Sequence, residues 1–503
     1  MHFFLRVQQF FLIFLIIAIA NGTFWMTKEF GDVYPFEFFF HLFYGLGDIG
    51  TINHGHALSL LFHLIISPFI ASSCILLCLY LISYARIKTP WVFWLASKTT
   101  QIFTTKYLLS AFALTIIFLL YSINIHYLFG TSSADDFFKE NYIQPSYEKI
   151  VAPSIKRNLI LIYVESLSAE YEDIERYPQD LLKNLKELTK NDFRLDFKQA
   201  FTNRWTQAGL FDSMCGLPLK ISFGRRFRDN PRLKRWNEKA TQFFNNQNTH
   251  SDFAPNITCL GSVLQHFGYT NVFMGGADLE FSGKGQFLNQ HGYQEAYGKK
   301  YWESIGENSF NQWGLNDDRL FFHAKNKILA LNRQDKPFNF TMLTLNLHEP
   351  SGFYDQTCKQ KNYFTYEGLI QCTDETLSEF INFFHENNLS KTTDLVIIGD
   401  HNPRKNISLV DDGPTNQSKI FNRFITTQPL KINRNATYHF GIFPSILNML
   451  GYSFPQNKLG LESSFFGGLN NDDLHISSLK PSELNGLINS YSLYYSKMMY
   501  GKK

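Results

Sequence analysis

The sequence predicts an α/β protein with a mostly parallel sheet and helices on both of its faces, preceded by an α-helical membrane region. After about residue 155, short apolar runs that end in polar residues alternate with helix-like stretches. Strands without a polar face, alternating with helices, are typical of parallel sheets that helices cover on both sides. Before residue 130 lie three long apolar segments that are almost free of charge.

The chain is expected to divide into four parts. Its length of 503 residues leaves room for a membrane part and a sizeable folded domain. We predict a transmembrane region over residues 1–130, a connector over 131–155, an α/β domain over 156–470 and a C-terminal extension over 471–503.

Three apolar segments are each long enough to cross the hydrocarbon core of a bilayer, namely residues 7–27, 57–85 and 107–129. The loop after the first segment has one lysine and four acidic residues, whereas the loop after the second is basic, with Arg86, Lys88, Lys98 and Lys106. The positive-inside rule therefore places residues 86–106 in the cytoplasm and everything after about residue 130 outside. We expect a multi-pass protein of the inner (cytoplasmic) membrane whose folded domain lies on the periplasmic or extracellular side. The aromatic stretch 34–50, which carries two acidic residues, is expected at the membrane interface.

The first segment has an alternative interpretation. Ala-Ile-Ala at residues 18–20 resembles a signal-peptide cleavage site. Cleavage there would remove one span without changing the side of the membrane on which the folded domain lies.

The charge pattern argues against a nucleic-acid partner. The formal net charge is +3 at pH 7, and the chain contains no block of lysine and arginine. Domains that bind nucleic acid usually carry such basic stretches or patches. We therefore expect no nucleic acid among the partners.

The six cysteines fall into two groups. Cys74 and Cys78 lie inside the second apolar segment, where they act as small apolar residues. The other four stand in the α/β domain, at positions 215, 259, 358 and 372. An even number in an oxidising compartment indicates two disulfides, for which spacing alone permits three connectivities. Buried free thiols are the alternative.

Side chains that can bind metals follow the apolar runs. Leu159–Val164 ends in Glu165, the run 338–347 ends in His348, and Leu395–Ile398 ends in Gly399-Asp400-His401. In open α/β sheets, ligands bind beyond the carboxyl ends of the strands. One carboxylate at such a place is usually a turn or cap residue. Several strand ends that supply oxygen and imidazole together predict a divalent metal site.

Thr206 offers a nucleophile. It stands at the start of an Ala-Gly-Leu stretch that can begin a helix, and a helix N-terminus favours an anion. A threonine hydroxyl becomes an effective nucleophile only when a neighbouring group activates it. The alternative for an isolated threonine is a simple helix N-cap.

Seven sequence blocks resemble a known family. In chain order they are YVES, WTQAGLFDSMCGLPL, CLGSVLQHFGY, GGADLEFSGKGQFLNQHGY, WGLNDDRL, LTLNLHEPSGF and IIGDH. Over roughly residues 155–470 the chain is similar to membrane-anchored phosphoglycerol transferases, the lipoteichoic acid synthase relatives within the alkaline phosphatase and sulfatase superfamily. The resemblance implies a sulfatase-like catalytic domain over residues 156–470.

The resemblance also implies a cofactor and a reaction. One divalent metal ion, manganese or magnesium with zinc also compatible, would be bound by Glu165, Thr206, Asp400 and His401. Thr206 would be the nucleophile as well. It would take sn-glycerol 1-phosphate from phosphatidylglycerol as a phosphothreonine ester and release diacylglycerol. An envelope glycan, such as a periplasmic glucan, or a glycolipid would then accept the group.

Four further residues are implied in substrate binding. His348 would contact the phosphoglycerol group or assist the leaving or attacking oxygen. Lys284 would suit an anionic intermediate, and Asp278 and Trp205 would line the pocket. The sequence departs from the family at Asn346, where close relatives can carry an acidic residue, and this departure argues against a second metal ion.

We predict the disulfides Cys215–Cys259 and Cys358–Cys372. The second would close a short loop just after His348, and the first would tie the helix that follows Thr206 to the next element. Each disulfide would stabilise the domain by roughly 3 kcal/mol.

The residues distinguish this function from three others. A sulfatase needs the pattern Cys/Ser-x-Pro-x-Arg, and we exclude it because Cys215 begins CGLPLK, which has no arginine and has its proline at the wrong offset. A phosphoethanolamine transferase would share the metal, the threonine and the topology. A non-catalytic envelope-binding protein of this fold would be expected to lack Thr206 or a metal ligand, and all four residues are present.

Overall fold

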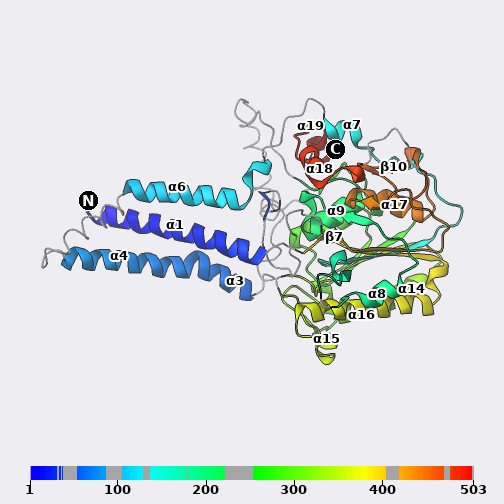
Figure 1. Ribbon diagram of the computed structural model, residues 1–503, viewed down its shortest axis with the longest axis horizontal. Coiled ribbons are helices and arrows are strands. Elements are labelled where there is room, and N and C mark those ends of the chain that lie inside the picture. The colour runs from blue at the N-terminus through cyan, green and yellow to red at the C-terminus, as the bar shows by residue number, and fades with distance from the viewer. Residues whose placement is uncertain are drawn as a thin grey trace. The chain divides into compact units, whose positions relative to one another are not determined.

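The structure is a computed structural model that describes residues 2–30, 33–35, 37, 54–85, 105–128, 136–177, 179–220, 253–349, 351–403, 418–468 and 476–500. The chain forms two compact units (Figure 1). The first comprises Met1–Phe38 and Ile52–Tyr127, and the second comprises Phe39–Thr51 and Leu128–Lys503.

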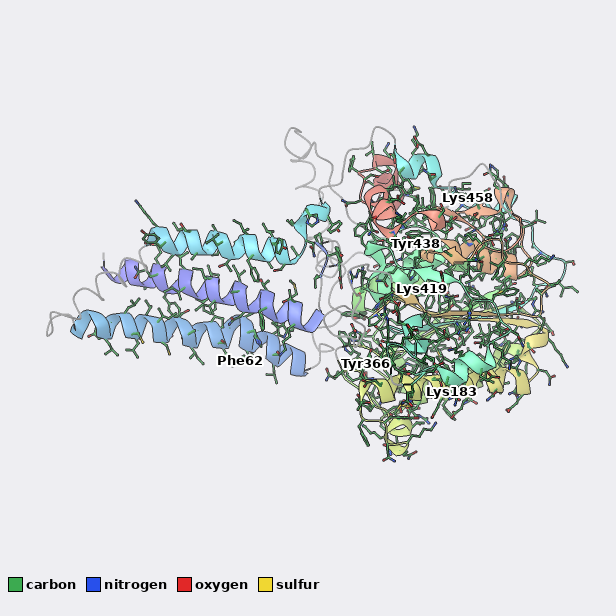
Figure 2. All side chains as sticks on the ribbon, in the orientation of Figure 1. Phe62, Lys183, Tyr366, Lys419, Tyr438 and Lys458 are labelled. Atoms are coloured by element: carbon green, nitrogen blue, oxygen red, sulfur yellow. A yellow bond between two sulfur atoms is a disulfide. The ribbon has the colours of Figure 1, made fainter. Side chains whose placement is uncertain are left out.

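The first unit consists of apolar helices. They are α1 (His2–Phe30), α3 (His54–Leu61), the π-helical turn η2 (Phe62–Ile66), α4 (Ser67–Ala85) and α6 (Thr105–Ser122). Helix α1 packs against both α4 and α6, and many large apolar side chains point outward from the three helices (Figure 2). Helices that are apolar all round are typical of membrane spans. Within the described residues, three segments are long and apolar enough to cross a membrane: Val7–Lys28, Leu58–Leu81 and Thr105–Ser122.

The third of these helices is shorter than the predicted segment 107–129. Helix α6 ends at Ser122, and Asn124 adopts a left-handed conformation with φ of 52°. Asparagine tolerates this conformation and commonly ends helices in it. Most of the predicted interfacial stretch 34–50 and of the predicted cytoplasmic loop 86–106 lies outside the described residues.

The second unit is built on a six-stranded sheet. Its strands are β1 (Asn158–Val164), β3 (Thr270–Gly275), β4 (Glu295–Tyr297), β5 (Phe338–Leu343), β6 (Thr393–Gly399) and β8 (Asn422–Ile425). They follow the order β4-β3-β5-β1-β6-β8. Every neighbouring pair is parallel except β6 with β8, which is antiparallel. The predicted fold class, a mostly parallel α/β sheet, is confirmed.

Helices cover both faces of this sheet, and side chains fill the space between the layers (Figures 1 and 2). One layer contains α8 (Lys183–Leu188), α14 (Asp317–Asn332) and α16 (Tyr366–Glu386), and the other contains α9 (Thr206–Cys215), α11 (Leu260–His266) and α17 (Ile442–Met449). The side chains of alternate residues in β1 contact the two different helix layers. Ile160 and Ile162 belong to the core shared with α14 and α16, whereas Tyr163 makes a 2.7 Å hydrogen bond to Ser213 of α9.

Shorter elements complete the unit. They are the strands β2 (Asp196–Lys198), β7 (Lys419–Ile420), β9 (Ala436–Thr437), β10 (Lys458–Leu459) and β11 (Glu462–Ser463), and the helices α7 (Phe137–Asn141), α12 (Lys284–Gln290), α13 (Lys299–Ser304), α15 (Gln356–Gln360), α18 (Pro481–Ile488) and α19 (Leu493–Tyr500).

The residues expected as a connector and as a C-terminal extension pack onto this unit. In the connector, Ile143 and Val151 form isolated bridges with Gly460 and Ser453. Near the C-terminus, the hydroxyl of Tyr495 in α19 donates to the carbonyl oxygen of Pro218 at 2.6 Å. The described residues of both segments therefore belong to the folded unit.

Two disulfides link helices of the second unit. Cys215, the last residue of α9, is bonded to Cys259, the N-cap of α11. Cys358 of α15 is bonded to Cys372 of α16. These are the two pairs predicted from the sequence.

Candidate active site

Two neighbouring strands bring the candidate metal ligands together. Strands β1 and β6 pair in parallel with Val164 opposite Gly399, so the residues that follow them, Glu165 and Asp400, leave the sheet side by side. One ligand atom from each of Glu165, Asp400 and His401 lies within 4.8 Å of the others. All three side chains are buried.

Ser166 orients both carboxylates of this cluster. Its backbone N–H donates a 2.8 Å hydrogen bond to Asp400 Oδ1, and its hydroxyl donates a 2.9 Å bond to Glu165 Oε1. The residue adopts a φ of 51°, a left-handed conformation that is costly for a residue with a Cβ and that clusters at functional sites. The sequence around Ser166 does not predict this conformation.

The hydrogen bonds of His401 fix its tautomer. Nδ1–H donates to the carbonyl oxygen of Asn402 at 2.8 Å, which leaves the lone pair of the neutral ring on Nε2. That atom faces Glu165 Oε1 at 3.4 Å and Asp400 Oδ2 at 3.5 Å. Bonding of the other ring nitrogen to a carbonyl is the usual arrangement of a metal-ligating histidine.

The electron-rich atoms of the cluster fit a bound cation. Among the described residues, no group donates a hydrogen bond to the buried Asp400 Oδ2. Burial raises the pKa of Asp400 to about 7, and the charge of Glu165 adds to the rise. Burial lowers the pKa of His401, but the charges of Asp400 and Glu165 outweigh burial and raise it to about 9. A divalent cation would compensate two carboxylates held this close to an imidazole nitrogen.

Thr206 borders the cluster at the start of α9. Its hydroxyl donates a 3.3 Å hydrogen bond to Glu165 Oε2. One helical turn later, Gly209 lies against the strand end, because a Cβ built there would stand 2.1 Å from the carbonyl oxygen of Asp400. The glycine therefore sets how closely the helix that carries Thr206 approaches Asp400.

We predict that Gly209→Ala displaces α9 and lowers activity by about 100-fold, because a shift near 1 Å at a reacting group can have this effect. Gly486→Ala in α18 is the matched control, since a Cβ there meets nothing within 4 Å. Purified variants should be compared by turnover and by thermal unfolding. Wild-type turnover of a folded Gly209→Ala protein would contradict this role.

His439 holds the other side of Asp400, and it was not predicted from the sequence. Its Nε2–H donates to the Asp400 carbonyl oxygen at 2.8 Å, and Asn203 donates to its Nδ1 at 2.6 Å. Burial lowers the pKa of His439 to about 3, so the ring is neutral. The backbone of Asp400 is thus fixed by β6, by Gly209 and by His439.

His348 lies within the electrostatic reach of the cluster, because burial raises the pKa of Glu165, whereas the hydrogen bond from His401 and the nearby imidazole of His348 lower it. The residue follows β5, and its Nδ1 donates to the carbonyl oxygen of Glu349 at 2.8 Å. Its ring centroid lies 4.7 Å from that of Trp313. Trp313 was not singled out in the sequence.

Lys284 and Asp278 share the surroundings of the cluster. Lys284 begins α12 and is 5% exposed. Burial lowers its pKa to about 8, although the charges of Glu165, Asp278 and Asp400 oppose the shift. Among the described residues, no hydrogen bond reaches the buried Asp278 Oδ2. Trp205, the N-cap of α9, is buried directly before Thr206.

A second group of potential ligands does not form a metal site. Asp355 lies near Cys358 and Cys372, but these sulfur atoms are bonded to each other and offer no thiolate. Asn346 is also engaged, because its Nδ2 donates to Asp355 Oδ2 at 2.8 Å. Within the described part of the chain, Glu165, Asp400 and His401 are the three-residue group whose ligand atoms remain available.

Comparisons with known proteins extend this description. A family model described as Sulfatase matches residues 157–452. "Phosphoglycerol transferase I" of Xanthomonas axonopodis pv. citri is 32% identical over 270 residues, covering 52% of this chain and 36% of the relative. The protein of the same name from Escherichia coli O127:H6 is 31% identical over 359 residues, covering 68% and 43%. The chain thus matches less than half the length of these curated relatives.

Solved structures give a more distant likeness. The lipoteichoic acid synthase LtaP from Listeria monocytogenes has a TM-score of 0.44 at 13% identity, covering 73% of this chain and 80% of that chain. The Streptococcus pyogenes phosphoglycerol transferase GacH, solved in complex with sn-glycerol-1-phosphate, has a TM-score of 0.44 at 16% identity, covering 71% and 89%. Because these TM-scores and identities are low, the family assignment rests on the match to the family model over residues 157–452.

Proposed function

Because the chain belongs to the sulfatase family, we propose that it uses the cluster around Glu165 for phosphoglycerol transfer. It would move sn-glycerol 1-phosphate from phosphatidylglycerol to a cell-envelope acceptor such as a periplasmic glucan. The observation that carries the proposal is Thr206, whose hydroxyl contacts Glu165 beside two further candidate metal ligands. The curated relatives named Phosphoglycerol transferase I support the choice of transferred group.

The reaction would take place in two steps at one phosphorus atom. Thr206 Oγ attacks the phosphorus of phosphatidylglycerol, the bond to the diacylglycerol oxygen breaks, and diacylglycerol leaves with a proton. An acceptor hydroxyl then attacks the phosphorus, the bond to Thr206 Oγ breaks, and the proton of the acceptor hydroxyl passes to Thr206 Oγ. Covalent catalysis of this kind replaces one difficult displacement by two easier ones.

The position of Thr206 suits this role. As the first residue of the ten-residue helix α9, it lies where unpaired backbone N–H groups and the helix dipole favour phosphate oxygens. Glu165 Oε2 accepts a hydrogen bond from the hydroxyl and so aims its oxygen. Gly209 lets the helix approach Asp400 closely, and His439 holds the backbone of Asp400 through a hydrogen bond.

Glu165, Asp400 and His401, with Thr206 as a fourth ligand, would hold one divalent ion. The ion would lower the pKa of the nucleophilic hydroxyl and stabilise charge on the phosphoryl oxygens. Two carboxylates and an imidazole suit manganese, magnesium or zinc. His348 would contact the phosphoglycerol group or assist the leaving or attacking oxygen.

The buried ammonium of Lys284 would attract the phosphate of the donor. A hydroxyl of the glycerol group could donate to Asp278 Oδ2, for which the described residues supply no hydrogen bond. The choice of phosphoglycerol over phosphoethanolamine is supported by the curated relatives named Phosphoglycerol transferase I. Asp278 and Trp205 would line the glycerol pocket.

We further propose that the second unit lies on the periplasmic or extracellular side of the cytoplasmic membrane. Three apolar helices precede it, and its two disulfides suit an oxidising compartment. A reporter that folds only after export, fused after Gly130, should be active. A cytoplasmic reporter at the same junction should be inactive, and the opposite pattern would contradict this topology.

The experiment that tests the function uses head-group-labelled phosphatidylglycerol. Membranes containing the protein should transfer the label to an envelope glycan or glycolipid and release unlabelled diacylglycerol, and Thr206→Ala membranes should not. Labelled phosphatidylethanolamine serves as the competing donor. Transfer from that lipid alone would replace the proposed donor, and transfer from neither lipid would contradict the proposal.

A further inference from the structure

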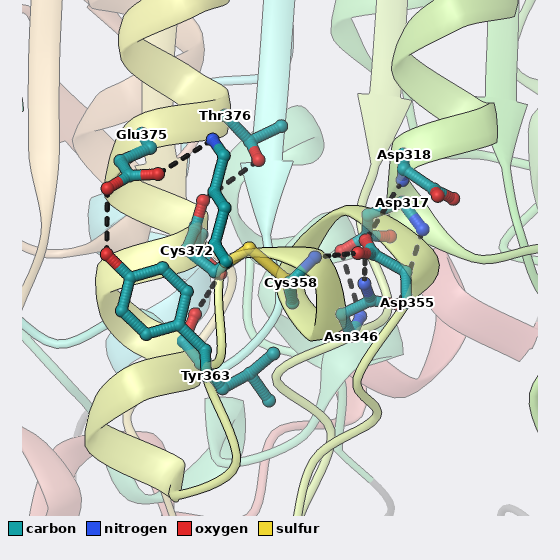
Figure 3. The surroundings of a disulfide bond; sticks show 12 residues. Asp317, Asp318, Asn346, Asp355, Cys358, Tyr363, Cys372, Glu375 and Thr376 are labelled. Carbon is teal, nitrogen blue, oxygen red and sulfur yellow. Dashed lines mark hydrogen bonds and ion pairs between the residues drawn. A yellow bond between two sulfur atoms is a disulfide. The ribbon is translucent and has the colours of Figure 1, made fainter.

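A buried hydrogen-bond network lies next to the Cys358–Cys372 disulfide (Figure 3). This network holds the loop that carries His348. Its side chains are Asp317 at the start of α14, Asn346 in the loop after β5, and Asp355 before α15. They are 7%, 2% and 3% exposed, respectively. None of these residues takes part in the proposed reaction steps.

Asp317 fixes the backbone at the base of the loop. Its Oδ1 accepts from the backbone N–H of Leu345 at 2.8 Å, and its Oδ2 accepts from that of Asn346 at 2.9 Å. The backbone N–H of His348 in turn donates to the carbonyl oxygen of Leu345 at 3.0 Å. A carboxylate that captures two consecutive N–H groups therefore sets the direction in which the chain reaches His348.

Asn346 links this carboxylate to the disulfide. Its Nδ2 donates to Asp355 Oδ2 at 2.8 Å, while Asp355 Oδ1 accepts from the backbone N–H of Cys358 at 2.8 Å. Cys358 is bonded to Cys372 in α16. The same helix holds the loop a second time, because the Tyr366 hydroxyl donates to the carbonyl oxygen of Leu347 at 2.9 Å.

The network requires an amide at position 346. An ionised aspartate there could not donate to Asp355, and its negative charge would stand next to the buried carboxylate of Asp355. Burial already raises the pKa of Asp317 to about 8, a rise to which Asp355 contributes and which the two backbone N–H groups oppose. Asn346 is thus the neutral donor that lets Asp317 and Asp355 lie close together.

We propose that Asp317, Asn346 and Asp355, anchored by the Cys358–Cys372 disulfide, position the imidazole of His348 for phosphoryl transfer. The inference rests on the proposed function only in assigning His348 a part in the reaction. Asp317, Asn346 and Asp355 act through His348 and are positioning residues. The disulfide makes the rigidity of the loop depend on an oxidised cysteine pair.

A double-mutant cycle with a compensating swap tests this inference. Asn346→Asp should lower kcat by about 10- to 100-fold, because a misplaced catalytic group loses rate rather than uniform binding. KM and metal content should change little. The swap Asn346→Asp with Asp355→Asn restores an N–H···O bond between the two side chains. The new amide nitrogen cannot accept from the backbone N–H of Asp318, which donates to Asp355 Oδ2 at 3.3 Å in the wild type, so the swap should recover part of the loss. In a His348→Ala background, Asn346→Asp should cause no further loss.

Hydrogen exchange provides a readout that needs no turnover. Amides in residues 345–353 should exchange faster in Asn346→Asp and after replacement of both Cys358 and Cys372 by serine, while amides of α9 should be unchanged. Glu375→Gln is the matched control, because Glu375 also lies on α16 near the disulfide but pairs with Lys361 at the surface. It should leave both rate and exchange unchanged.

The outcomes separate this inference from the proposed function. Turnover should be measured with phosphatidylglycerol and with a chromogenic phosphodiester. A wild-type protein that cleaves the phosphodiester but not the lipid would contradict the proposed donor, and the cycle could still be measured. An Asn346→Asp loss of equal size with and without His348, or unchanged exchange in residues 345–353, would overturn the inference.

Discussion

Thr206→Ala is expected to abolish both half-reactions, release of diacylglycerol and transfer to the acceptor, lowering turnover by on the order of 10⁴- to 10⁶-fold. The reason is geometric, since the Thr206 hydroxyl contacts Glu165 at the N-terminus of α9. Turnover should be followed as diacylglycerol release from phosphatidylglycerol in detergent micelles.

Two variants separate loss of the oxygen from loss of shape. Thr206→Val keeps the branched side chain and removes the hydroxyl, so it should be as inactive as Thr206→Ala. Thr206→Ser keeps the oxygen and should retain measurable activity. Normal turnover of the valine variant would refute a nucleophilic role for this residue.

Asp400→Asn is expected to remove the metal ion and the activity together. The variant keeps Oδ1, which accepts from the backbone N–H groups of Ser166 and His401 at 2.8 Å each. It replaces Oδ2, the buried oxygen that faces His401 Nε2, by an amide that cannot bind a cation. Metal affinity should fall by more than about 100-fold, since even a supporting residue around a metal site can account for that much.

The control for Asp400 lies in the strand that precedes it. Asp394 of β6 pairs with Arg157 at 2.8 Å, at the opposite end from the cluster. Asp394→Asn should lower the unfolding temperature while the folded protein keeps its metal, because it leaves a buried arginine without its charged partner. Elemental analysis of both variants decides the matter, and full metal occupancy in Asp400→Asn would contradict the assignment.

Metal affinity should also depend on pH. Without the ion, the pKa of His401 is raised to about 9 and that of Asp400 to about 7. Both groups must lose their protons to act as ligands. Affinity should therefore rise as pH increases toward about 9 and fall steadily below it.

The sequence was sufficient to predict the central strands and their polar ends. Apolar runs of this kind identify buried strands, and β1, β5 and β6 lie where the sequence predicts them. The edge strands β4 and β8 were missed. Strand β8 contains Asn422 and Arg423, which are buried through hydrogen bonds to Leu195 and Thr189 and so conceal the strand pattern.

Helix boundaries were predicted less well because distant residues decide them. The sequence PQDLLKNLKELTKN has a helix-like pattern over residues 178–191, but α8 spans only Lys183–Leu188. Asp374 of α16 accepts from the backbone N–H groups of Asn184 and Leu185 and fixes the start of the helix. These two hydrogen bonds join groups that are 190 and 189 positions apart in the chain.

The sequence also predicts only part of the candidate site. The residue types Glu, Thr, Asp and His could be recognised at strand and helix ends, but their proximity depends on β1 and β6 being neighbours. The sequence does not reveal strand order. The left-handed Ser166, the close approach of Gly209 and the hydrogen bond from His439 to Asp400 also depend on the assembled fold.

The central claim is a covalent phosphoglycerol ester on Thr206, and trapping that ester tests it most directly. Purified protein loaded with manganese should be mixed with phosphatidylglycerol in the absence of an acceptor, quenched in acid, digested and analysed by mass spectrometry. The account predicts an added glycerol phosphate on the peptide that contains Thr206, with one diacylglycerol released per modified chain. Diacylglycerol released over many turnovers by Thr206→Val, or a glycerol phosphate on another residue, would contradict it.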